Sequence, residues 1–277
     1  MTALLGPIAP PGLHIMTFNI RRRMPVTLRP ADRWRRRAPL LRDLLAAERP
    51  TILAAQEVLP SQLGALTTGL GPRYRRLGHG RGARRQGEGT PLFYDAHRLA
   101  LEAWEQRALS DRPTEPGSRG WGAPTPRIFV EAVFVDRATG ARFVVIGTHF
   151  DVFSARARLR SAEAVRVRVA QHGLPAVVLG DLNATPASPP QRAFRTGDML
   201  RDAWTLAELR LTPEWGTLAG YRPPREHGRR IDAVLVSPGI RVVRIAINAG
   251  PGNPRTGPWP SDHLPVQAEL RMPEKHP

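Results

Sequence analysis

The chain of 277 residues contains no cysteine and a single lysine, Lys275. Without cysteine the protein can form neither disulfides nor zinc-thiolate sites, and it has no thiol nucleophile. No apolar run approaches the about 20 residues that a membrane-spanning helix requires, so we expect no membrane span. Residues 1–12 lack a basic region and are interrupted by glycine and proline, which is not typical of a secretory signal. Together these features predict a cytoplasmic protein.

Acidic residues are also scarce. The sequence has 24 Asp+Glu against 41 Lys+Arg, which gives a formal net charge of +17. A basic surface attracts phosphates and releases counterions from nucleic acid, so the charge predicts a polyanionic partner. Arginine is most concentrated in segments 21–37 and 73–85. Two interpretations stay open for these segments: a surface that binds anions, or an arginine-rich composition in which they are solvated helix faces or loops.

The pattern of apolar residues predicts a fold made mainly of strands. β-Branched and apolar runs predict strands over 13–19, 51–56, 91–94, 128–135, 142–149, 176–179, 231–236, 240–247 and 264–270. Helical spacing predicts one helix over 31–49, capped by Asp32, and another over 154–171, ended by Gly173. Stretches 78–89 and 112–126 are rich in glycine or proline and predict long loops. Many strands with few helices between them indicate an α+β fold, a two-sheet β-sandwich flanked by helices.

Polar residues fall at the ends of these predicted strands. They either close a strand or directly precede one: Asn19, Glu57, His149, Asp181, Asn183, Asp232, Asp262 and His263. Side chains at strand ends lie at a sheet edge, where a cleft can form. Carboxylates that converge there can bind a hard cation such as Mg²⁺, and histidines with acidic neighbours can transfer protons or stabilise charge.

Eight short segments carry a resemblance to a known family. In chain order they are TFNI at 17–20, QE at 56–57, GEGTPLFY at 87–94, PRI at 126–128, GTHFD at 147–151, GDLNA at 180–184, RID at 230–232 and SDHLP at 261–265. The ordered set resembles the endonuclease/exonuclease/phosphatase superfamily. The resemblance implies a four-layer, deoxyribonuclease-I-like fold in one catalytic domain over 13–272, with tails at 1–12 and 273–277. It also implies a metal-dependent phosphoesterase.

The same resemblance implies a role for each site residue. Glu57 matches the main Mg²⁺ ligand, with Asn19 and Asp262 close to the metal or its waters, and Mn²⁺ is expected to substitute. Asp181 resembles the residue that orients or deprotonates the attacking water. Asn183 is expected to hold a phosphate oxygen and to keep Asp181 in place.

The remaining implied roles concern the phosphate group. His263 resembles the histidine that binds the phosphoryl oxygens as charge develops, with Asp232 fixing its orientation. His149 matches a second phosphate contact or proton donor, and Glu88 matches the acidic residue that pairs with it. Arg127 is expected to clamp a substrate phosphate. The implied reaction is in-line attack of water at phosphorus.

The sequence favours the first of three functions. The first is a nuclease that cleaves DNA or RNA, in which arginines bind the backbone and Trp34 or Trp121 is available to stack on bases. The second is a phosphatase or phosphodiesterase for small phosphorylated metabolites or lipid head groups. The third, a non-catalytic anion-binding module, does not need a water-activating carboxylate such as Asp181. An open basic groove favours the first and a small cleft the second. We expect a monomer.

Overall fold

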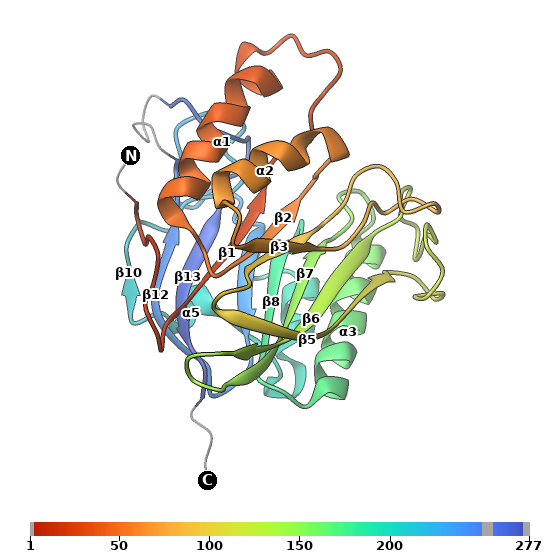
Figure 1. Cartoon of the computed structure of the whole chain (residues 1–277). Coiled ribbons are helices and arrows are strands. Elements are labelled where there is room, and N and C mark those ends of the chain that lie inside the picture. The colour runs from red at the N-terminus through yellow and green to blue at the C-terminus, as the bar shows by residue number, and fades with distance from the viewer. Residues whose placement is uncertain (1–2, 251–256, 274–277) are drawn as a thin grey trace.

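Two mixed β-sheets form the centre of the molecule, as the computed structural model of residues 3–250 and 257–273 shows (Figure 1). The larger sheet has seven strands, in pairing order β10 (Leu209–Arg210), β12 (Arg241–Ile247), β13 (Val266–Arg271), β1 (Leu13–Asn19), β2 (Ile52–Gln56), β4 (Leu92–Asp95) and β3 (Tyr74–Leu77). The smaller sheet has six strands, in pairing order β5 (Leu99–Ala108), β6 (Ile128–Asp136), β7 (Arg142–His149), β8 (Ala176–Asp181), β11 (Asp232–Val236) and β9 (Arg201–Asp202).

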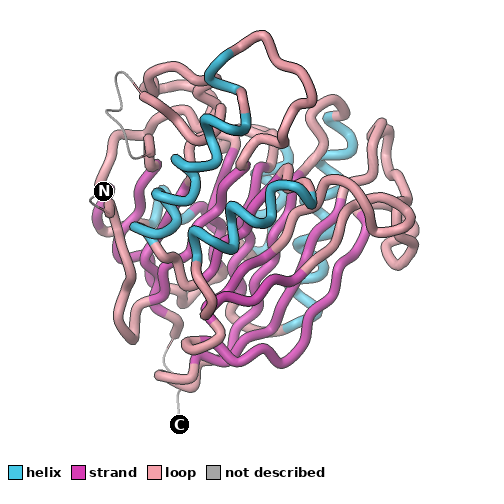
Figure 2. Tube along the Cα trace, turned by 45° about the horizontal axis from the view of Figure 1, so that its top comes forward, coloured by secondary structure: helices cyan, strands magenta, loops and turns pink. Residues whose placement is uncertain are grey.

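Helices cover the outer faces of both sheets (Figure 2). The seven-stranded sheet packs against α1 (Trp34–Glu48) and α2 (Leu63–Leu70). The six-stranded sheet packs against α3 (Ala155–His172) and α4 (Pro189–Arg195). The shorter helices are α5 (Ala203–Leu206), η1 (Pro30–Asp32), η2 (Pro60–Gln62) and η3 (Thr196–Asp198). The order helix, sheet, sheet, helix confirms the predicted α+β sandwich and its four layers.

Strand β1 illustrates how the sequence builds these layers. Leu13 and Ile15 point between the two sheets and join the central apolar cluster. Met16 and Phe18 alternate with them and pack under α1 and α2. All four side chains have no exposed surface, and full burial of such a side chain contributes roughly 1.5–3 kcal/mol. The alternation of side chains that predicted the strand therefore also packs it against the other sheet on one face and against the helices on the other.

The direction of the strands brings together the ends of the two sheets that carry the predicted site residues. In the larger sheet β1 runs parallel to β2, and in the smaller sheet β7 runs parallel to β8. The sheets approach closely at Gly147 in β7, where a Cβ atom would meet Leu92 Cδ2 at 2.7 Å and Ala54 Cβ at 3.2 Å. A side chain at this position would push the sheets apart beside the end of β7.

The start of α1 differs from the prediction. The helix begins at Trp34, because 30–32 form a separate 3₁₀ turn and Arg33 is the N-cap residue. Asp32 does not cap the helix. Its carboxylate instead accepts a hydrogen bond of 2.6 Å from the hydroxyl of Tyr221. Arg37 in the same helix is fully buried, so the solvated-face interpretation of segment 21–37 is wrong for this residue.

Other expectations about individual elements had mixed outcomes. Helix α3 is capped by Ser154, whose hydroxyl accepts a 3.0 Å hydrogen bond from Ala157 N, and it ends at Gly173 in the left-handed conformation as predicted. Trp34 packs against the apolar cluster under α1 rather than standing free. The structure adds strands β3 and β5 and helices α2 and α4, which the sequence pattern did not predict.

Within the described ranges, we find no helix with the length and apolar character needed to cross a membrane. The domain bounds 13–272 and the monomeric state stay predictions. Of the two predicted tails, positions 1–2 and 274–277 lie outside the described residues.

Candidate functional site

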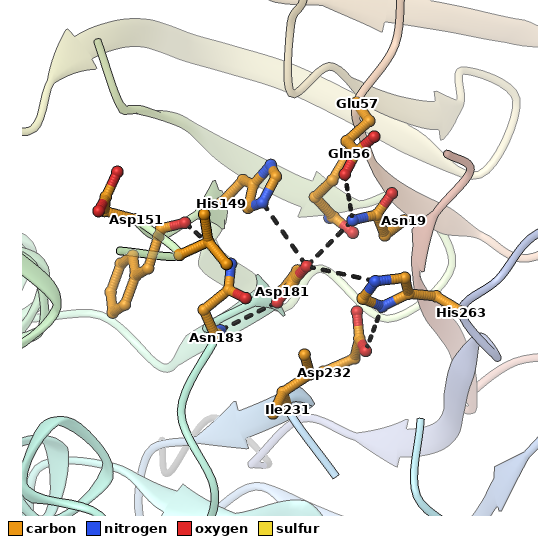
Figure 3. Close-up of polar contacts among 12 residues, drawn as sticks. Asn19, Gln56, Glu57, His149, Asp151, Asp181, Asn183, Ile231, Asp232 and His263 are labelled. Carbon is orange, nitrogen blue, oxygen red and sulfur yellow. Dashed lines mark hydrogen bonds and ion pairs between the residues drawn. The ribbon is translucent and has the colours of Figure 1, made fainter. Parts of the chain in front are cut away.

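Three neighbouring strands of the smaller sheet, β7, β8 and β11, place a row of polar side chains at the same end of the sheet. In the parallel pair β7–β8, His149 lies opposite Asp181. In the antiparallel pair β8–β11, Asp181 lies opposite Asp232. His149 and Asp181 end their strands, whereas Asp232 begins its own. The register of the sheet therefore aligns an imidazole and two carboxylates in the order His149, Asp181, Asp232 (Figure 3).

The larger sheet contributes a second set of polar groups from the opposite side. Asn19 ends β1, and Glu57 directly follows β2 with a left-handed backbone, φ 60°. The amide nitrogen of Asn19 donates to Glu57 Oε1 at 3.2 Å and to Asp181 Oδ2 at 3.0 Å. Asn19 thus connects a carboxylate of one sheet with a carboxylate of the other (Figure 3).

His263 lies between two carboxylates. Its Nδ1 is 2.9 Å from Asp232 Oδ2 and its Nε2 is 3.8 Å from Asp181 Oδ2. Burial alone lowers the pKa of His263, but the charges of Asp232 and Asp181 outweigh burial and raise the pKa to about 10. His263 therefore carries a positive charge at neutral pH.

Asp181 is poised to exchange a proton near neutral pH. Burial and the charge of Asp232 raise its pKa to about 7, against the opposing effects of His263, Asn19 and a 2.9 Å hydrogen bond from Asn183 N. Asp181, Asp232 and His263 form a buried cluster whose potential ligand atoms lie within 4.8 Å of one another. The cluster thus places one cationic imidazole between two carboxylates.

The second histidine differs from the first. Burial, followed by the positive charges of Arg127 and Arg81, lowers the pKa of His149 well below 6.5, so His149 is neutral. Its Nε2 is 3.6 Å from Asp181 Oδ2 and its Nδ1 is 3.9 Å from Glu88 Oε1. Glu88 pairs more closely with Arg81, through contacts of 3.0 Å to each carboxylate oxygen. The expected Glu88–His149 pair is therefore a longer contact than the Glu88–Arg81 pair.

Arg127 combines burial with a free donor. It is 7% exposed, and its Nε is 3.4 Å from Asp151 Oδ2. Among the described residues, Arg127 Nη1 has no hydrogen-bond partner. A buried guanidinium donor without a partner is costly unless a ligand satisfies it. This geometry fits the predicted role of Arg127 as a phosphate clamp.

Glu57 and Asp262 supply the donor set that fits a divalent cation. Burial raises the pKa of Glu57, but hydrogen bonds from Arg22 N and Asn19 outweigh burial and keep the carboxylate ionised. Burial raises the pKa of Asp262; the charges of His263 and Arg21 oppose this, and the negative charge of Glu57 adds to it more weakly. Two carboxylates that repel each other in a shared cleft are stabilised by a hard cation, for which oxygen ligands are preferred. Asn19 directs its nitrogen toward Glu57, while its oxygen accepts from Arg21 N at 3.0 Å.

One cleft collects most of these groups. It has a volume of about 390 Å³, and eight of the predicted site residues line it: Glu57, Glu88, Arg127, His149, Asp181, Asn183, Asp262 and His263. The other two, Asn19 and Asp232, are fully buried and do not line it. Three further arginines line the same cleft, Arg21, Arg22 and Arg81. The structure thus brings together the residues that the sequence predicted, although their roles stay predictions.

Sequence reasoning missed Arg37 as a support of this site. Its guanidinium donates to the carbonyls of Ile20 at 2.8 Å and Arg21 at 3.1 Å, which follow Asn19, and to the carbonyl of Pro260 at 3.3 Å. It therefore ties the end of β1 to the segment that carries Asp262. A signal existed, since Arg37 precedes the buried Leu41 by four residues on the same helix face.

Asp151 was the second residue that the sequence pattern did not single out. It is fully buried; its Oδ1 accepts hydrogen bonds from Phe153 N and Ser154 N, at 2.9 and 2.7 Å, and its Oδ2 faces Arg127. Asp151 therefore positions both a predicted phosphate clamp and the loop before α3. Its place two residues after His149 was the available signal.

Comparison with known proteins places the chain in a family. The model of the endonuclease/exonuclease/phosphatase family matches residues 16–263. No curated protein matches. An endonuclease/exonuclease/phosphatase from Bacteroides vulgatus is 31% identical, with a TM-score of 0.86 and coverage of 94% of this chain and 99% of that one. Mannosyl-6-phosphatase Bt3783 from Bacteroides thetaiotaomicron is 28% identical, with a TM-score of 0.84 and coverage of 93% and 99%.

A more distant structure shares the fold alone. The structure of TDP2 from D. rerio with a single-strand DNA product is 14% identical, with a TM-score of 0.66 and coverage of 94% of this chain and 99% of that one. Because the family model spans most of the chain and the Bacteroides vulgatus structure covers nearly all of it, the chain belongs to the endonuclease/exonuclease/phosphatase family of phosphoester hydrolases.

Proposed function

We propose that the protein is a divalent-metal-dependent hydrolase of small phosphoesters. One observation carries the proposal: the proton acceptor Asp181, the cationic His263 and the nearly buried Arg127 line one cleft of about 390 Å³. This volume suits a phosphate with a small organic group. The 28% identity to a mannosyl-6-phosphatase over 93% of this chain supports the same substrate class.

In the proposed hydrolysis, different side chains of the chain have different roles. Asp181, with a pKa of about 7, accepts a proton from water as it attacks phosphorus in line with the leaving oxygen. His263 and Arg127 face the phosphoryl oxygens with positive charge, and such fixed charges stabilise the transition state. His149 is neutral, so it serves as a hydrogen-bond donor to the phosphate.

Glu57 and Asp262 are the residues that would hold Mg²⁺ or Mn²⁺, while Asn19 keeps Glu57 in place. The bound cation supplies charge neutralisation at a phosphoryl oxygen. Asp232 contributes indirectly, since its contact with His263 Nδ1 fixes the imidazole and keeps it protonated.

A nuclease is the second candidate, and the charge of the chain favours it. The net charge is +17, and the arginine-rich segment 21–37 begins two residues after Asn19. A nucleic acid bound in the cleft would therefore meet arginines directly beside the site. Its binding would weaken steeply with added salt, whereas a single phosphate group would show a shallow dependence.

An activity panel with and without Mg²⁺ or Mn²⁺ separates the two candidates. The substrates are hexose 6-phosphates, nucleoside monophosphates and glycerol 3-phosphate on one side, and plasmid, single-stranded DNA and RNA on the other. We expect metal-dependent release of phosphate from the small substrates. Cleavage of polymers alone would replace the proposal with a nuclease.

Two variants test the mechanism in the same panel. Asp181→Asn and His263→Ala should remove activity while the protein stays folded. Asp198→Asn is the matched control, because Asp198 is an exposed carboxylate paired with Arg201 outside the cleft. Full turnover by Asp181→Asn, or by the wild type in chelator, would refute the mechanism.

A further inference from the structure

Part of the cleft's rim is apolar, although arginines and acidic residues also line the cleft. Three large apolar side chains that line it are exposed to solvent: Val152 by 49%, Phe153 by 77% and Leu218 by 37%. Apart from Trp104, Phe153 is the only aromatic residue among the exposed large apolar side chains of the described part of the chain. Because all three line the same cleft, they differ from singly scattered surface residues and offer an apolar surface that a ligand in the cleft can cover.

Phe153 is held in place by the loop that carries it. Its backbone N donates to Asp151 Oδ1 at 2.9 Å, and Arg158 Nη1 donates to the carbonyls of Asp151 and Val152 at 3.0 Å each. Asp151 in turn faces Arg127 through its other oxygen, at 3.4 Å. Asp151 therefore holds the backbone that carries the aromatic ring and also orients Arg127, the predicted phosphate clamp.

Leu218 is linked in the same way to the other side of the site. It forms a β-bridge with His263, and the neighbouring Ala219 N donates to the carbonyl of Asp262 at 2.9 Å. Leu218 thus contacts His263 directly, and Phe153 is linked to Arg127 through Asp151. Such a preorganised arrangement places the organic part of a substrate at a fixed position relative to its phosphate.

We propose that Phe153 and Leu218 form a binding subsite for a ring next to the phosphate, so that the preferred substrates are phosphoesters of cyclic groups. The inference rests on the proposed function, because it assigns the organic part of the same substrate. A ring offers a flat apolar face that covers Phe153, as either a base or the CH face of a sugar, whereas an acyclic group such as glycerol covers little of it.

The test compares kcat/KM for three substrates in the presence of Mg²⁺: a hexose 6-phosphate, a nucleoside 5′-monophosphate and glycerol 3-phosphate. For the wild type we expect at least one ring substrate to exceed glycerol 3-phosphate. Phe153→Ala should reduce this ratio about tenfold, mainly through KM, because the ring of the substrate then has no aromatic face to stack on. Phe153→Tyr should restore the ratio, since it keeps the ring face.

Leu209→Ala is the matched control, because Leu209 is a 52% exposed apolar residue of β10 that does not line the cleft. It should leave the ratio unchanged. Whichever ring substrate loses more in Phe153→Ala identifies the base or the sugar as the ring that is bound. Equal rates for cyclic and acyclic substrates, or an unchanged ratio in Phe153→Ala, would overturn the ring subsite and leave the phosphoesterase intact. Failure to hydrolyse any small phosphoester would overturn the proposed function itself.

Discussion

Replacing Asp232 with asparagine is expected to lower the pKa of both His263 and Asp181. Asp232 Oδ2 lies 2.9 Å from His263 Nδ1, and its negative charge raises the pKa of that histidine and also of Asp181. Asparagine has nearly the same size, so the substitution removes the charge while keeping the packing. Both titrating groups then lose the same source of negative potential.

The expected shift follows from the strength of the lost interaction. A hydrogen bond to a charged group is worth about 1.5–3 kcal/mol, and one pKa unit corresponds to about 1.4 kcal/mol. The pKa of His263 should therefore fall by about 1–2 units from its value of about 10. The pKa of Asp181 should move downward from about 7.

Both limbs of the pH profile should shift in the same direction, so activity should rise on the acidic side and fall on the basic side. Activity rises as Asp181 loses its proton and falls as His263 loses its own, so the wild type should show limbs at about 7 and about 10. In Asp232→Asn both limbs move to lower pH. Because the two groups interact, each limb belongs to the cluster as a whole.

Two measurements check this shift. One is the pH dependence of kcat/KM with Mg²⁺, and the other is an NMR titration of the His263 imidazole in chelator, which does not depend on catalysis. Asp198→Asn removes an exposed carboxylate instead and should leave both results as in the wild type. A wild-type His263 that titrates near 6.5, or an Asp232→Asn profile that moves to higher pH, would refute the reasoning.

Three further predictions concern stability. Asp181 has a pKa of about 7 in the folded chain against an ordinary value of 3.8, so its ionisation opposes folding increasingly as pH rises between these values. The free energy of unfolding of Asp181→Asn should therefore exceed that of the wild type by about 1–3 kcal/mol at pH 8, and by less at pH 4. Urea unfolding with chelator measures this difference, and equal stability at pH 8 would contradict the prediction. Arg37→Met leaves carbonyls unpaired beside the site and should lose about 3–5 kcal/mol, measured by thermal unfolding. Ser154→Ala removes the N-cap of α3 and should lose about 1 kcal/mol in the same assay, with little change in kcat.

The sequence predicted the buried strands because burial leaves a direct trace in residue type. The central strands are apolar and β-branched, and the polar residues that end them stand out against this background. Strand β5 was missed because much of its surface is half-buried or exposed, so charged and apolar residues mix along it. Helix α2 was missed because two glycines and two threonines within eight residues reduce its helical propensity.

The candidate site was predicted residue by residue, whereas its layout was not. Sequence order separates Asp181 from Asp232, yet the two lie opposite each other because β11 pairs with β8. Which strands pair is decided by long-range contacts that leave no local signal. Arg37 shows the same limit, since its charge indicates solvent exposure until the backbone carbonyls that surround its guanidinium are known.

The charge states of the two site histidines depend on this layout in particular. Both imidazoles are nearly fully buried, and burial alone lowers the pKa of each. His263 is a cation because Asp232 and Asp181 outweigh burial, whereas His149 is neutral because burial lowers its pKa and the charges of Arg127 and Arg81 lower it further. Asp181 lies between the two, 3.6 Å from His149 Nε2 and 3.8 Å from His263 Nε2. A water bound at Asp181, as proposed, would therefore have a fixed positive charge on one side and a neutral donor on the other, and this asymmetry requires residues from both sheets.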